Sequence, residues 1–295
     1  MIYVPFNAAG VSTGVARMPQ AIRSAGVEAL LPAPVQSTWI AVNSLTTARG
    51  PSGLISENAL SQVVLDAAQG VGAAWRDGKI PLVVAGDCPL LLAPLIAAAD
   101  RGGAGLVFID GHEDAWNPKD TPTGEASDCE IGLALGIFDG PAELVPHLPC
   151  LQAPHLVVLG PRDQAEMADG GQQSIRGRVA RYLSGAHLAA KTDTDRYGEV
   201  TDLVAGGAAV AEAGWWCHVD LDVLETPSLP AVDYPQPGGL TWSQLERLTA
   251  ACLRVPGCLG ASVVIYNPDL DGGKAAERIT QYIAFIRDRV PLYLG

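Results

Sequence analysis

The sequence predicts an α/β protein whose mainly parallel sheet is covered by helices on both faces. Stretches with the composition of buried strands alternate along the chain with stretches whose apolar residues have helical spacing. Three of the strand-like stretches end in polar residues that can bind metals, at residues 82–88, 105–114 and 215–222. Such alternation is typical of parallel strands joined by helical crossovers. No linker or internal repeat interrupts it, so residues 1–295 are expected to form one domain.

In the first half of the chain, short apolar runs predict strands and longer periodic stretches predict helices. The expected strands are residues 2–5, 38–42, 79–85 and 105–109. The expected helices are residues 19–25, 56–77, 90–99 and 128–136. Pro19 suits the first turn of its helix because its missing N–H is not needed there. Ser56 is expected to cap the second helix, although the full capping-box pattern is absent.

The second half of the chain continues the alternation. The expected strands are residues 155–160, 187–191, 215–221 and 258–265. The expected helices are residues 173–183, 198–213, 240–253 and 273–288. Thr241 and Gln244 form a capping-box pattern, which predicts that the third of these helices begins at this point.

Composition argues against several classes of partner. A net charge of −13 does not suit non-specific contact with nucleic acid or an anionic membrane. No apolar run reaches the ~18 residues of a membrane span, and the first residues lack the basic segment of a signal peptide. The six cysteines include no Cys-x-x-Cys pair, so they are expected to be reduced thiols. We therefore expect a cytoplasmic protein that acts on a small molecule.

Metal-binding residue types follow two of the strands at alternate positions. Asp110, His112 and Asp114 end one strand, and Asp220 and Asp222 end another. Extended backbone sends alternate side chains to one side, and the carboxyl ends of parallel strands meet at one edge of a sheet. Carboxylates and imidazole suit Mn, Fe, Co or Zn. Four carboxylates and a histidine exceed the need of one ion and suit two ions with a water between them. Taken alone, an acidic stretch would equally solvate a loop or cap a helix.

These motifs resemble the signature of the arginase, or ureohydrolase, superfamily. The matching segments are Gly14-x-x-x-Met18-Pro19, Ala85-Gly86-Asp87-Cys88, Asp110-x-His112-x-Asp114, Leu159-Gly160-x-Arg162-Asp163, Asp220-x-Asp222 and Tyr266-Asn267-Pro268. The resemblance covers most of the chain and implies a three-layer α/β/α domain and a binuclear site, most often for Mn²⁺. It further implies hydrolysis of a linear C–N bond in a guanidino, amidino or related small molecule. A homo-oligomer, either a trimer or a hexamer, is also implied.

The resemblance assigns roles to the matching residues. Asp110 and Asp220 match positions that contact both ions, and His112 and Asp222 match ligands of the second ion. Asp114 matches a ligand of the first ion, and it is also expected to act in catalysis. Water held between two such ions is acidified, to a pKa of ~7 in favourable cases. The hydroxide formed would attack the trigonal carbon of the substrate.

Asp87 and Cys88 each leave two interpretations open. Asp87 is expected either to orient a ligand or the water, in a catalytic role, or to cap the helix ahead of Pro89. Cys88 stands where the family usually has a histidine that binds the first ion, and a hydroxyarginine-hydrolysing branch resembles this chain in having cysteine there. A thiolate ligand would favour Zn, Fe, Co or Ni over Mn. An inert packed thiol would leave only one ion well bound.

Two further departures concern the substrate. The family's Ser-Gly-Asn-Leu-His motif has Glu125 and Ser127 in place of its substrate-binding Asn and its proton-relay His. Glu125 either faces a cationic substrate group or is a solvated loop carboxylate. Ile265 replaces the guanidinium-binding Glu of the arginases, and a buried guanidinium without its carboxylate is costly. Arginine is therefore not the expected substrate. Trp116 and Asn117 are expected to line the pocket or to pack beside it.

Two alternatives to this function remain open. A hydrolase of a small amide without a guanidinium is favoured by Ile265. A family member that has lost efficient catalysis would serve as a binding or structural subunit, but the four retained aspartates and one histidine argue against it. His218 is expected to point away from the side of Asp220, as a core histidine or a support for a ligand. The rigid loop at residues 233–239 is expected at the metal edge, where it would shape specificity.

Overall fold

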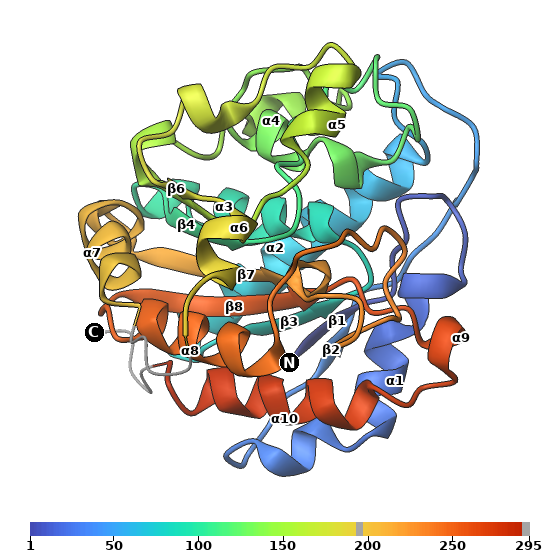
Figure 1. Cartoon of the computed structure of the whole chain (residues 1–295). Coiled ribbons are helices and arrows are strands. Elements are labelled where there is room, and N and C mark those ends of the chain that lie inside the picture. Colours follow the sequence, from blue (N-terminus) through green and yellow to red (C-terminus); the bar gives the residue numbers. More distant parts are fainter. Residues whose placement is uncertain (193–196, 291–295) are drawn as a thin grey trace.

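One eight-stranded sheet forms the centre of the protein (Figure 1). The computed structural model describes residues 1–192 and 197–290. The strand order is β2-β1-β3-β8-β7-β4-β5-β6, and every neighbouring pair is parallel. The strands are β1 (Ile2–Val4), β2 (Thr38–Trp39), β3 (Leu82–Ala85), β4 (Gly105–Ile109), β5 (Leu156–Leu159), β6 (Tyr182–Leu183), β7 (Trp215–Asp220) and β8 (Cys258–Val264). The predicted parallel sheet is confirmed.

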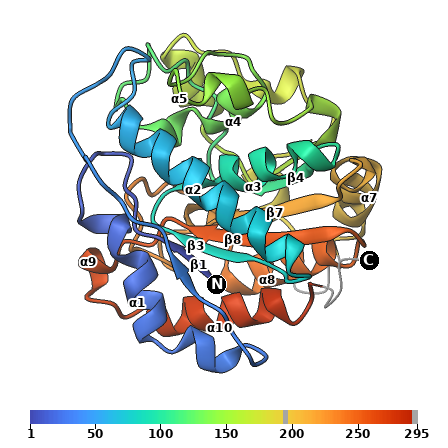
Figure 2. The same cartoon turned by 180° about the vertical axis from the view of Figure 1, so that it is seen from behind.

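Helices cover both faces of the sheet and complete three layers. The α-helices are α1 (Met18–Ser24), α2 (Glu57–Arg76), α3 (Leu92–Ala97), α4 (Glu130–Ala134), α5 (Gln164–Asp169), α6 (Gly185–Ala189), α7 (Gly198–Gly206), α8 (Trp242–Leu253), α9 (Pro268–Asp271) and α10 (Ala276–Arg287). Helices α2 and α3 pack together on one face (Figure 2). Helices α1, α8 and α10 lie along the other face. None of the helices in the described residues has both the length and the hydrophobicity of a membrane span.

The central strands owe their positions to continuous apolar sequence. Every residue of β3, β4, β7 and β8 is buried, as expected for strands that are covered on both faces. Trp215 and Trp216 of β7 are fully buried side chains of this core, and burial of one large apolar side chain contributes about 1.5–3 kcal/mol. This packed frame fixes the ends of β3, β4 and β7, which carry the predicted ligands, and the end of β8, which leads to Ile265.

The helix-capping predictions have different outcomes. At α8 the capping box is present: the Thr241 side chain accepts from the Gln244 backbone, and Gln244 reaches back to the backbone of Thr241. At α2, Ser56 stands at the N-cap position but makes no capping bond, so the expected cap is wrong. Its hydroxyl donates instead to the carbonyl of Thr46 at 2.6 Å, and its backbone has a left-handed φ of 52°.

Sequence patterns fail in the segment between β5 and β7. The predicted helix at residues 173–183 is wrong, because this stretch holds only a 3-10 turn, Ile175–Gly177, followed by β6. Strand β6 pairs with β5. The predicted strand at residues 187–191 lies largely in α6, whose first turn is capped by Ser184. Helices α5 and α9 were not predicted, because elements this short depend on tertiary contacts more than on periodicity.

Candidate metal centre

The carboxyl ends of β3, β8, β7 and β4 meet at one edge of the sheet and open into a pocket of about 330 Å3. Ligand sites in open α/β sheets lie at this edge. Nine of the described residues that line the pocket carry carboxylates, and none is a lysine or an arginine. They are Asp87, Asp114, Glu125, Asp128, Asp163, Glu166, Asp220, Asp222 and Asp233. The loop at residues 233–239 lies at this edge, as predicted, and its residues 233–236 line the pocket.

The segment after β4 brings its three candidate ligands together. Ligand atoms of Asp110, His112 and Asp114 lie within 4.8 Å of one another. Asp110 is fully buried. One of its oxygens, Oδ1, accepts the backbone N–H of His112 at 2.7 Å, whereas Oδ2 has no hydrogen-bond partner in the described chain. Asp114 has a left-handed φ of 45°, so the chain turns sharply at the third ligand.

The segment after β7 is linked directly to the one after β4. Asp220 accepts the backbone N–H of Asp222 at 2.8 Å. One carboxylate oxygen of Asp222 accepts from the backbone of Gly111 at 3.0 Å, and the other lies 2.9 Å from Nδ1 of His112. A Cβ at Gly111 would stand only 2.8 Å from that first Asp222 oxygen, so glycine is required for this close approach. The two Asp motifs therefore form one rigid cluster.

His218 lies on the same side of β7 as Asp220, so its expected direction is wrong. Residues two apart on a strand share a face, and ligand atoms of His218, Asp110 and Asp220 lie within 4.8 Å of one another. Its Nδ1 is 2.7 Å from the Ser262 hydroxyl, and its Nε2 has no partner in the described residues. Burial lowers the pKa of His218 to about 3, so the ring is neutral.

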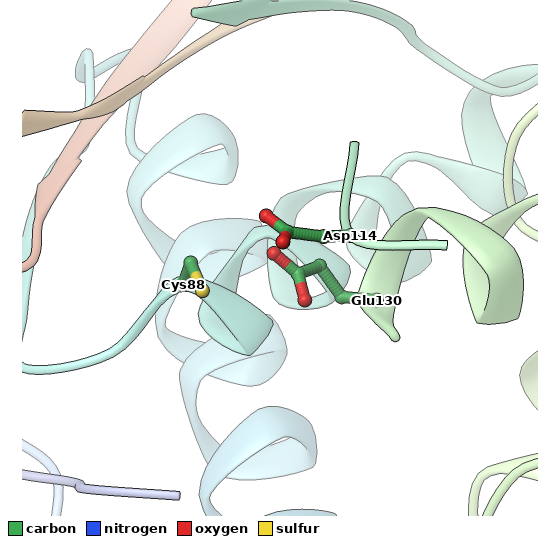
Figure 3. A group of neighbouring side chains, drawn as sticks. All are labelled: Cys88, Asp114 and Glu130. Atoms are coloured by element: carbon green, nitrogen blue, oxygen red, sulfur yellow. The ribbon is translucent and has the colours of Figure 1, made fainter. Parts of the chain in front are cut away.

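Cys88 lies beside a carboxylate that the sequence did not single out. Ligand atoms of Cys88, Asp114 and Glu130 lie within 4.8 Å of one another, and all three side chains are buried (Figure 3). Burial, followed by the charge of Glu130, raises the pKa of the Cys88 thiol well above its usual range. A signal for Glu130 existed: it is an acidic residue among small and apolar ones, in Cys129-Glu130-Ile131-Gly132-Leu133.

The geometry of Asp87 matches the capping alternative. One of its carboxylate oxygens accepts the backbone N–H of Cys88 at 3.0 Å and thereby caps the 3-10 turn Cys88–Leu91. The other accepts the backbone N–H of Ala8 at 2.6 Å. Burial raises the pKa of Asp87 to about 6. Asp87 thus fixes the backbone of Cys88, and its catalytic role stays a prediction.

Most of the predicted substrate-facing residues line the pocket, but Asn117 does not. Those that line it are Trp116, Glu125, Ser127 and Ile265. The Asn117 side chain turns back and accepts the backbone N–H of Lys119 at 3.1 Å, so of the two expected places it takes the one beside the pocket and not the one in its wall. Ile265 has a φ of 62°, which is a strained conformation for a β-branched residue.

Glu113, between two candidate ligands, was also missed by the sequence analysis. It is fully buried and points away from them. It accepts hydrogen bonds from the Ser174 hydroxyl at 2.6 Å, the Ile175 backbone at 2.7 Å and the Tyr182 hydroxyl at 2.7 Å. Its own backbone N–H donates to Asp163 at 3.0 Å. Glu113 therefore anchors the ligand-bearing segment to distant parts of the chain.

The side chains in this cluster fit divalent cations. The buried side-chain atoms without partners include Asp110 Oδ2, both oxygens of Glu130 and Nε2 of His218, and all are ligand types for a divalent ion. Uncompensated buried carboxylates are costly, and no lysine or arginine lines the pocket among the described residues. Cations would supply the missing partners.

Without metal, the protein is expected to lose stability as the pH rises. Burial, followed by neighbouring carboxylates, raises the pKa of Asp110 to about 7 and raises those of Asp114 and Asp220 well above their usual range. A raised pKa in the folded state favours folding with the group protonated. This contribution is complete below an unfolded pKa of about 4 and is lost as the pH rises through about 7. Thermal melts in EDTA at about pH 5 and about pH 8 measure it.

Added Mn²⁺ or Co²⁺ is expected to reverse this trend, because the cation binds the deprotonated ligands. At a hundred times the dissociation constant, binding contributes ~2.7 kcal/mol, which corresponds to a rise in Tm of roughly 5 °C for a chain of this size. A Tm that responds neither to EDTA nor to added metal would contradict a metal site here.

Comparison with known proteins gives one consistent family. A family model described as the arginase family matches residues 1–286. An N(omega)-hydroxy-L-arginine amidinohydrolase from Streptomyces lavendulae is 28% identical over 216 residues, which cover 73% of this chain and 69% of that protein. An arginase from Bacillus caldovelox is 25% identical over 228 residues, which cover 76% and 73%. The crystal structure of an arginase from Bacillus cereus has a TM-score of 0.79 at 20% identity and covers 97% of this chain and 96% of that one, which shows a shared fold.

Proposed function

The chain belongs to the arginase family, and we propose that it uses two divalent ions to hydrolyse a linear C–N bond in a cationic guanidino or amidino small molecule. The observation that carries this proposal is the charge of the pocket: its described lining includes nine carboxylates and no lysine or arginine. Even after the proposed metal ligands are set aside, six carboxylates remain on the wall: Asp87, Glu125, Asp128, Asp163, Glu166 and Asp233. A cleft lined by one sign of charge attracts and orients a ligand of the opposite sign.

The chain's own residues would hold the ions and position the substrate. Asp110 and Asp220 are proposed to contact both ions, Cys88 and Asp114 the first, and His112 and Asp222 the second. When bound, the ions supply an acidified water as nucleophile and withdraw charge from the reacting carbon. Nδ1 of His112 lies 2.9 Å from a carboxylate oxygen of Asp222, so the two proposed ligands of the second ion already lie side by side.

Glu125 is proposed to bind the cationic group of the substrate. It lies in the pocket wall, and one of its carboxylate oxygens accepts the Tyr234 hydroxyl at 3.0 Å. Burial raises the pKa of Glu125 to about 7, and a cation beside it would favour the charged form. Ile265 stands where the arginases have their guanidinium-binding Glu. The substrate cation would therefore be bound by Glu125, on a different side of the pocket.

The change Glu125→Gln is expected to lower kcat/KM for a guanidino or amidino substrate at least tenfold, because it removes one partner of a charge pair in a half-buried pocket wall. The expected number of bound ions is unchanged, since Glu125 is not among the proposed ligands. Glu143→Gln removes an exposed carboxylate outside the pocket and serves as the control. Equal kcat/KM for the two variants would contradict this role of Glu125.

Substrate and metal are identified together by an activity screen. Guanidino acids, hydroxyguanidines, amidines and small amides are offered to protein loaded separately with Mn, Co, Ni and Zn. The relative from S. lavendulae is named as an amidinohydrolase of hydroxyarginine, which supports the amidino class. Turnover of small amides alone would support the second candidate, which the apolar Ile265 side chain favours. Absence of turnover by the metal-loaded protein on all of these would contradict the proposal.

Assembly and organisation complete the proposal. We propose a single domain over residues 1–295, and a homo-oligomer, either a trimer or a hexamer, as the family resemblance implies. Light scattering coupled to size exclusion measures the mass of the assembly. Manganese is the expected metal if Cys88 is not a ligand, and a softer ion is expected if it is.

A further inference from the structure

Glu130 is a buried acid without a hydrogen-bond partner, at the first residue of α4. Its exposed fraction is 0%, and neither carboxylate oxygen receives a hydrogen bond within the described chain. Its side chain points toward Asp114 and Cys88, which come from two other segments (Figure 3). A buried carboxylate is retained only where something compensates its charge or keeps it protonated.

Among the described residues, the ionisable side chains with the largest effect on Glu130 are Asp110, Cys88 and Asp114, and none of them carries a positive charge. Asp110 acts through its charge, whereas Cys88 and Asp114 lie close enough for side-chain contact with the Glu130 carboxyl. Two other acidic groups within ligand distance of Glu130 therefore point to a common cation between them.

The backbone holds Glu130 in this position. The carbonyl of Asp114 accepts the N–H of Ile131 at 2.9 Å and that of Gly132 at 3.3 Å, so the start of α4 is bonded directly to the segment that carries Asp114. The carbonyl of Ser127 accepts the Cys88 thiol at 3.7 Å, which links the turn before α4 to the third donor. These bonds place the donors without using their carboxylate oxygens.

We propose that Glu130 is a further protein ligand of the first metal ion, beside Cys88 and Asp114. This inference rests on the proposed two-ion site and extends it by one residue. The donor atoms lie within 4.8 Å of one another, and bonds of ~2.0–2.3 Å allow opposite ligands up to ~4.6 Å apart. Cys88, Asp114 and Glu130 would then hold the first ion alone, while Asp110 and Asp220 would be shared with the second, and Glu130 would compensate for the histidine that Cys88 replaces.

The test uses Glu130→Gln, which keeps the size of the side chain and removes its charge. Parent and variant are stripped with EDTA and titrated with Co²⁺, and bound metal is counted by elemental analysis. Calorimetry gives the two affinities, and the sulfur-to-cobalt absorption band reports the ion next to Cys88. Glu130→Gln is expected to bind one ion with the parental affinity and the other at least tenfold more weakly, because loss of a direct ligand exceeds loss of an outer partner. The thiolate band is expected to weaken at equal Co²⁺.

Two further variants separate a ligand from a structural acid. Glu166→Gln changes a carboxylate that lines the same pocket and is expected to keep both affinities. Glu130→Asp keeps the charge on a shorter side chain and is expected to have an intermediate affinity. In EDTA, Glu130→Gln is expected to melt no lower than the parent, since a buried uncompensated charge is removed, while its rise in Tm with Co²⁺ is smaller. A structural acid would leave that rise unchanged.

The outcomes distinguish this inference from the proposed function. A parent protein that binds two ions, with a Glu130→Gln variant that binds both with the parental affinities, overturns the role of Glu130 alone. A parent protein that binds no Co²⁺, Mn²⁺ or Zn²⁺ overturns the two-ion function itself, and the inference with it.

Discussion

Asp220→Ala is expected to abolish binding of both ions and to lower turnover by at least about 10³-fold, because the nucleophile and the charge stabilisation come from the same two ions. Asp220 is almost fully buried at the end of β7. Its neighbours within ligand distance are Asp110 and His218. Removal of this carboxylate leaves Asp110 as the only proposed bridge between the ions.

Asp114→Ala is the matched comparison, because Asp114 is proposed to contact the first ion only. This variant is expected to keep the second ion, held by His112 and Asp222, at near-parental affinity. Elemental analysis after dialysis counts the ions in each variant, and Asp233→Asn, a change in the pocket wall outside the proposed ligands, is the control. Loss of a single ion from both alanine variants would contradict the assignment of Asp220 as a bridge.

Cys88→His is expected to raise Mn²⁺ affinity at the first site at least tenfold. Burial and the surrounding carboxylates raise the pKa of the Cys88 thiol, so a metal that uses this sulfur must displace its proton. Imidazole is neutral as a ligand and suits Mn better than sulfur does. Parental occupancy of the first site is accordingly expected to fall at acid pH and to favour softer ions.

Calorimetric titration with Mn²⁺ and with Zn²⁺ measures this change in preference. Turnover of the variant also depends on the charge balance at the site, so the Mn²⁺ affinity is the deciding readout. The control is Cys252→Ser, a buried thiol of α8 outside the pocket. Unchanged Mn²⁺ stoichiometry and affinity in Cys88→His would place Cys88 outside the ligand set.

The elements that the sequence predicted correctly are those with long, regular residue patterns. Continuous apolar runs located β3, β4, β7 and β8, and the spacing of Asp110, His112 and Asp114 located a cluster at their ends. Alternation along a strand is a property of the backbone itself, so it carries over from sequence to structure without knowledge of distant contacts.

The parts that were missed depend on contacts far apart in sequence. Glu130 lies near Cys88 because the start of α4 is hydrogen-bonded to Asp114. The residue pattern within 128–136 does not predict this contact. The α6 segment is short, and its start is decided by a local Ser184 cap rather than by its apolar content. His218 was misplaced although the alternation rule, applied consistently, puts it beside Asp220.

The hydrogen bonds of Glu113 have a consequence for how quickly and how tightly ions are captured. Five groups hold this one side chain or its backbone, from Asp163, Gln164, Ser174, Ile175 and Tyr182. The segment between His112 and Asp114 is therefore already ordered before an ion arrives. A flexible ligand segment would lose conformational entropy on capture, at about 1–2 kcal/mol for each residue fixed. Here the segment loses that entropy during folding. Ion binding therefore does not have to offset it, and more of the metal–ligand interaction free energy appears as affinity. The segment also stays ordered when an ion is released.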